Sequence, residues 1–137
     1  MNHSLPGRAQ LEGLTRGWYG VTLFGAVLGL FTSFMSGLAF TSLVATGIAT
    51  SVSLLFVFLI GRSLLNRSAF MRGTMLVLAS LMACVGTYGL FRLVVLETWS
   101  WSSLIMVMNV AAGLAMNVRS VKVLTSRSAN AYFGGTV

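Results

Sequence analysis

The chain has 137 residues, of which 56% are hydrophobic and only 8% are charged, and its formal net charge is +7. A soluble domain carries about 25% charged residues, so this composition excludes an ordinary water-soluble fold and predicts an integral membrane protein. Because the cations flank apolar segments, we attribute them to membrane orientation and to contact with anionic lipid, and we expect no nucleic-acid partner.

Residues 1–16 form a short polar segment before the first apolar run. Ser4 followed by Pro6 is typical of a helix start. A helix that begins there has an apolar face with Leu11, Leu14 and Trp18 and a charged face with Arg8, Glu12 and Arg16. This pattern predicts an interfacial helix that leads into the first span. A disordered tail is the alternative for so short a segment.

The stretch from Gly17 to Gly61 contains no charged residue, and it is about twice as long as one bilayer crossing requires. We divide it into two spans, 17–37 and 41–61, joined by a tight turn. The apolar run that begins the stretch is longer than the about 7–15 residues of a signal-peptide core, so we expect the first span to remain in the membrane.

Small residues mark where these first two spans pack. Gly25 and Gly29 lie four positions apart on one helix face, where they allow another backbone to approach closely. The first half of the second span, 45–53, is rich in Ala, Gly, Ser and Thr, and we expect it to be buried among helices. Its second half, 54–60, is bulky and apolar, which favours contact with lipid.

The third and fourth spans are predicted at 73–95 and 99–118. Small residues form one face of the third span, namely Ala79, Ala83 and Gly86. Asn109 lies in the middle of the fourth span, close to the helix face of Gly113, and its amide cannot reach water. We expect it either to form a hydrogen bond with another helix or to line a polar cavity.

Arg92 lies about one turn from the outer end of the third span. It can extend to the interface and pair there with Glu97, with Tyr88 one turn deeper. These three residues form a candidate polar site, which is interpreted either as an interfacial anchor or as a site for an anionic substrate.

The distribution of Lys and Arg predicts the topology. Six cations between and beside the spans are expected to contact lipid headgroups, namely Arg16, Arg62, Arg67, Arg72, Arg119 and Lys122. By the positive-inside rule, both termini and the connection between the second and third spans are cytoplasmic. The segment 119–137 is a cytoplasmic C-terminal tail whose last residues we expect to be loosely held. The fold class is therefore an all-α, up-down, four-helix membrane bundle in the plasma membrane, with a bacterial inner membrane as the expected location.

The sequence offers little for chemistry. It has one His, one Cys and two carboxylates, Glu12 and Glu97, so no acid–base pair, nucleophile–base pair or metal-ligand set can be assembled. We expect no catalytic, cofactor-binding or metal-binding residue and no enzymatic activity.

Two functional hypotheses follow. The first is an accessory, assembly or inhibitory subunit of a larger membrane complex, which packs through its small-residue faces against other subunits or against itself. The second is a small oligomeric channel or transporter. Small multidrug transporters have a similar outline of four spans, but the glutamate in their first span has no counterpart here.

Overall fold

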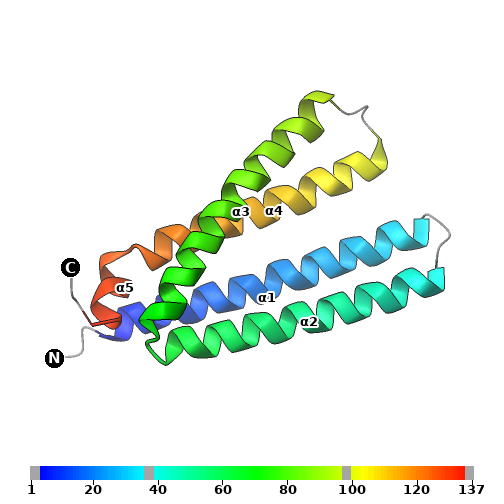
Figure 1. Cartoon of the computed structure of the whole chain (residues 1–137). Helices are drawn as coiled ribbons and strands as arrows, with labels where there is room; N and C mark the ends of the chain where they lie inside the picture. Colours follow the sequence, from blue (N-terminus) through cyan, green and yellow to red (C-terminus); the bar gives the residue numbers. More distant parts are fainter. Residues whose placement is uncertain (1–3, 36–38, 97–99, 135–137) are drawn as a thin grey trace.

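The computed structural model describes residues 4–35, 39–96 and 100–134, and helices make up almost all of these residues (Figure 1). The helices are α1 (Ser4–Met35), α2 (Ala39–Leu65), α3 (Ala69–Leu96), α4 (Trp101–Leu124) and α5 (Arg127–Tyr132). Four of them, α1 to α4, are long and apolar enough to cross a membrane. The prediction of an all-α protein is therefore confirmed, and four of its helices could span a membrane.

Each long helix continues past its predicted span at the same end of the molecule. There α1 begins at Ser4, α2 ends at Leu65, α3 begins at Ala69 and α4 ends at Leu124. We call this the terminal end, because the described chain begins there with α1 and ends there with α5 (Figure 1). The N-terminal segment is accordingly the first part of one continuous helix that runs into the first span.

The apolar core lies at the terminal end. It receives side chains from all five helices, namely Leu11, Leu14, Leu64, Met75, Met116, Leu124 and Tyr132. Leu11 and Leu14 are both 1% exposed, so the apolar face expected for an N-terminal helix packs inside the protein. The extra helical turns beyond the predicted spans thus provide part of the surface on which the two halves of the chain associate.

The long helices form two hairpins, α1–α2 and α3–α4 (Figure 1). Helix α1 also packs against α4 and α5, whereas contact between α2 and α3 is slight. The hairpins lie close together at the terminal end and diverge toward the opposite end (Figure 1). The expectation that 45–53 is buried is therefore wrong, since Ala45, Gly47 and Ala49 are exposed. Among the described residues, this half of α2 packs mainly against α1, because α3 turns away from it.

Polar contacts tie α5 to the terminal end. The Tyr132 hydroxyl donates to the Leu65 carbonyl at the end of α2, with an O–O distance of 2.6 Å. Arg72 donates through Nε and Nη2 to the Leu124 carbonyl at 3.1 and 2.8 Å, and also to the Asn130 side chain. The Arg67 guanidinium lies 4.9 Å from the centre of the Tyr132 ring. We call Arg67, Arg72, Asn130 and Tyr132 the terminal clamp.

The terminal clamp changes the description of the C-terminal segment. Residues expected to form a tail instead continue α4 to Leu124 and then form α5. The 0% exposure of Ala129 and the 5% exposure of Tyr132 show that α5 is part of the core. Residues 135–137 lie outside the described part of the chain.

Candidate functional site

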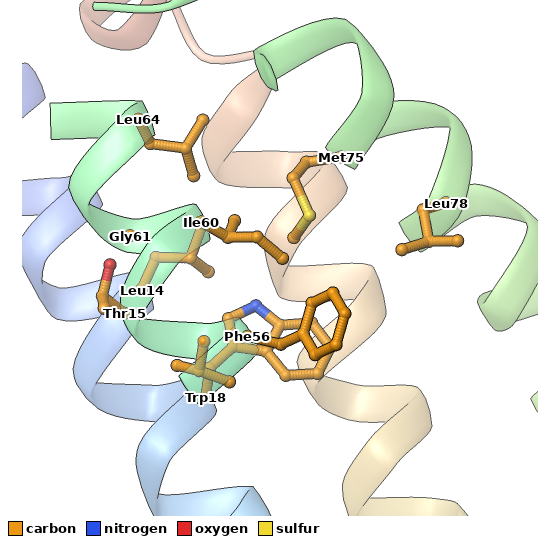
Figure 2. A pocket seen from close by; sticks show the side chains of 10 residues that line it. Leu14, Thr15, Trp18, Phe56, Ile60, Gly61, Leu64, Met75 and Leu78 are labelled. Atoms are coloured by element: carbon orange, nitrogen blue, oxygen red, sulfur yellow. The ribbon is translucent and has the colours of Figure 1, made fainter. Parts of the chain in front are cut away.

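A cleft lies between the two hairpins, and both of them contribute lining residues. Its part nearest the terminal end is an apolar pocket of about 130 Å³. Figure 2 shows that side chains of three helices surround this pocket, among them Trp18 of α1, Phe56 and Ile60 of α2, and Met75 and Leu78 of α3. None of the described residues that line it is charged, so it suits an apolar group.

The cleft continues away from the terminal end as a groove of about 360 Å³. Its floor and walls come from α1, α2 and α4, and its lining residues are Val21, Thr22, Gly25, Ala26, Thr46, Ala49, Thr50, Ser53 and Asn109. Leu14 and Trp18 of the pocket and Val21 and Gly25 of the groove recur at helical spacing. The pocket and the groove therefore lie along one face of α1, and we call the two together the cleft.

The groove gathers side chains that can form hydrogen bonds. They are Thr22, Thr46, Thr50, Ser53 and Asn109, and within the described chain none of them has a hydrogen-bond partner. Hydroxyls elsewhere bond to their own helix: Thr32 donates to the Leu28 carbonyl at 2.6 Å. The threonine and serine hydroxyls of the groove can do the same by rotating.

The Asn109 amide differs from these hydroxyls because it carries two donors and an acceptor. It lies in the middle of an apolar helix, on its exposed side. A polar group without a partner in hydrocarbon costs several kcal/mol. Asn109 is therefore the residue of the cleft that most strongly requires a partner from outside the described chain.

Gly25 brings α1 and α4 together beneath this amide. A Cβ at Gly25 would lie 3.2 Å from Asn109 Oδ1, whereas a Cβ at Gly29 would lie 3.5 Å from Thr46 Cγ2. The two glycines of the predicted packing face thus contact two different helices of the same chain. Gly25 joins α1 to α4, and Gly29 joins α1 to α2.

The small residues of α3 pack within their own hairpin. Ala79 is 2% exposed, Ala83 is half-buried, and a Cβ at Gly86 would lie 3.5 Å from Leu114 of α4. Gly113 of α4 is half-buried, but a Cβ there would meet no atom within 4 Å. Gly86 therefore packs against α4 within its own hairpin, and none of the three α3 residues is among the described residues that line the cleft.

The candidate polar site is not assembled in the described residues. Tyr88 is 68% exposed, Arg92 is exposed, and neither lines the groove that contains Asn109. No hydrogen bond or ring contact joins Tyr88 to Arg92 in the described part of the chain. Glu97 lies outside the described residues.

The six cations expected at lipid headgroups differ in their surroundings. Five are exposed, namely Arg16, Arg62, Arg67, Arg119 and Lys122, and their contact with headgroups stays a prediction. Arg72 is half-buried, and its guanidinium binds Leu124 and Asn130 within the protein. Its role in the structure is therefore to hold α3, α4 and α5 together.

Sequence reasoning missed the shared face of Thr46, Thr50 and Ser53, although their spacing of four and three positions places them on one side of a helix. It also missed the hydrogen bond from Trp18 Nε1 to Ser120 Oγ, 3.1 Å long, which links α1 to α4. Nothing in the local sequence pairs residues so far apart in the chain. Comparisons with protein-family models, with curated proteins and with solved structures found no match.

Proposed function

We propose that this protein is a non-catalytic subunit of a membrane complex that binds a transmembrane helix of another subunit in the cleft between its hairpins. The same mode of binding would serve an accessory, an assembly or an inhibitory subunit. The observation that carries the proposal is the Asn109 amide, which has no hydrogen-bond partner among the described residues and lies in a groove of small residues. A helix seated in the groove supplies the missing partner and covers the exposed half of α2.

The lining of the cleft suits a helix. Gly25, Ala26 and Ala49 add little bulk to the groove, so an incoming backbone can approach closely. The Asn109 amide then bonds to a polar group of that helix, and the apolar pocket next to Met75 accepts a large apolar side chain. No proton transfer or covalent step is needed, and packing together with one hydrogen bond determines the fit.

The orientation in the membrane is part of the proposal. All Lys and Arg residues except Arg92 lie on helix segments or turns at the terminal end. The positive-inside rule then places the terminal end in the cytoplasm and gives the four long helices an up-down topology. We propose the plasma membrane, and the inner membrane of a bacterium, as the location.

The test is replacement of Asn109 by Leu, which keeps the branched shape of the side chain and removes the amide. We expect binding of the partner to weaken by about three- to thirtyfold, since hydrogen bonds between membrane helices contribute about 0.6–2 kcal/mol. The measurement is co-elution of the tagged full-length protein with unlike chains after extraction in mild detergent.

Asn117→Leu is the matched control, because Asn117 lies on the same helix and does not line the groove. Recovery of the partner should be unchanged in this variant. Equal recovery with Asn109→Leu and with the wild type would contradict the proposal. A discrete homo-oligomer that moves anions into liposomes and loses this activity on Arg92→Ala would favour a transporter instead.

A further inference from the structure

A second groove lies at the terminal end, on a neighbouring face of the α1–α2 hairpin. It has a volume of about 520 Å³, and its lining includes Arg8, Tyr19, Phe58, Arg62, Leu65 and Asn66. Thr15 and Gly61 line both this groove and the apolar pocket of the cleft. The close contact between Thr15 and Gly61 therefore separates this groove from the apolar pocket. We call it the basic groove.

The basic groove offers hydrogen-bond donors from both helices. Arg8 and Arg62 stand on neighbouring helices and are exposed. The side chains of Arg62, Tyr19 and Asn66 have no partner within the described chain. Arg8 Nε is paired with Glu12 Oε1 at 2.9 Å, which leaves its terminal N–H groups for another acceptor. Planar guanidinium groups match the oxygens of a phosphate with two parallel hydrogen bonds.

The charge of the basic groove suits one monoanion. Arg8 and Glu12 form an ion pair of zero net charge, so Arg62 supplies the uncompensated positive charge of the lining. A phosphodiester carries a single negative charge that complements it. Asn66 and the Tyr19 hydroxyl can then donate to the remaining phosphate or headgroup oxygens.

The remainder of the lining is apolar. Phe58 and Leu65 line the groove beside the cations, and the same helix continues with the exposed side chains of Leu55 and Leu59. A ligand that fills the whole groove thus needs a phosphate at one end and a hydrocarbon chain at the other. Inorganic phosphate would leave the apolar side empty.

We propose that the basic groove is a binding site for an anionic phospholipid. Its phosphate lies between Arg8 and Arg62, and one acyl chain follows Phe58 along α2. This site is distinct from the cleft between the hairpins, and it does not depend on which partner the cleft binds.

The test uses native mass spectrometry of the full-length protein in mild detergent, titrated with phosphatidylglycerol or with phosphatidylcholine of the same acyl chains. We expect wild-type protein to bind phosphatidylglycerol more tightly. Arg62→Gln should weaken phosphatidylglycerol binding by about tenfold, as expected for the loss of one charge-assisted hydrogen bond. Arg8→Gln should have a smaller effect, because Glu12 already neutralises Arg8.

Arg127→Gln is the matched control, because Arg127 is an exposed cation of α5 that does not line the basic groove. Its lipid affinity should stay within about twofold of wild type, since removing a distant exposed charge has little effect. An equal loss in Arg62→Gln and Arg127→Gln would overturn the proposal in favour of diffuse attraction. Equal affinity for the two lipids, or displacement of lipid by an equal concentration of inorganic phosphate, would also overturn it.

Thermal unfolding of each variant without added lipid checks its fold. The double variant Tyr19→Phe with Asn66→Ala tests the same site without changing its charge.

Discussion

Replacement of Arg72 by Met is expected to release α5 and to lower the free energy of unfolding by about 3 kcal/mol. The guanidinium donates to the Leu124 carbonyl through two nitrogens and to the Asn130 side chain through one of them. It also lies 5.3 Å from the centre of the Phe133 ring. Met restores much of the apolar stem but none of these donors. The carbonyl of Leu124, at the end of α4, then loses a charged partner.

Two measurements report this change in mild detergent. Thermal unfolding gives the loss of stability, and trypsin digestion reports the exposure of α5 through cleavage after Arg127. Arg72→Lys should give an intermediate result, because an ammonium is a point charge without the planar fork of donors. Arg127→Lys, at an exposed cation of α5, keeps the cleavage site and should leave the trypsin pattern unchanged. Unchanged stability and digestion in Arg72→Met would show that the terminal clamp does not hold α5.

Replacement of Gly61 by Ala is expected to destabilise the α1–α2 hairpin by about 1–3 kcal/mol, the usual cost of overpacking. A Cβ at this position would lie 2.6 Å from Cγ2 and 3.2 Å from Oγ1 of Thr15. Thr15 has little freedom to move, because its hydroxyl donates to the Leu11 carbonyl at 2.9 Å and β-branched side chains are restricted in helices. The two helices must therefore separate.

A second substitution tests this cause directly. Thr15→Ser removes Cγ2 and keeps the hydroxyl, so the double variant Gly61→Ala with Thr15→Ser should recover most of the lost stability in a thermal unfolding assay. Gly47→Ala is the control on the same helix, since a Cβ there would meet no atom within 4 Å. It should be neutral or stabilising by about 0.5–1 kcal/mol, because Ala favours a helix over Gly. A double variant as unstable as Gly61→Ala alone would contradict the steric explanation.

The four long helices were predictable because the composition of a segment determines whether it can remain in water or must lie in a membrane. A run such as Gly17 to Gly61, without a charged residue, can be accommodated only as helices in a nonaqueous environment. The ends of the helices were less predictable. A charged residue ends a membrane span, but the helix itself can continue through it. Arg8 and Arg16 lie within α1, and Arg72 lies within α3. The helices continue through these residues because their apolar neighbours, such as Leu11 and Met75, pack in the core.

Individual residues of the cleft were predictable from the sequence, but their arrangement in space was not. Asn109 was expected to need a partner, and Gly25 was expected to permit close approach, but their contact depends on the relative rotation of α1 and α4. The exposure of 45–53 was missed because composition cannot say how many helices surround a segment. The terminal clamp was missed as well, since Arg72 and Leu124 lie in different helices, and no local pattern predicts which carbonyl a distant guanidinium will bind.

The length of the helices determines how far a tilt at the terminal end moves their opposite ends. Helix α2 has 27 residues, so at 1.5 Å per residue it is a rod of roughly 40 Å. The core and the terminal clamp join the α1–α2 hairpin to the α3–α4 hairpin at the terminal end, and a tilt of about 10° at that base would displace the opposite end of such a rod by roughly 7 Å. A small change of angle near Arg72, where α3, α4 and α5 meet, would therefore change the distance between the hairpins at their far ends.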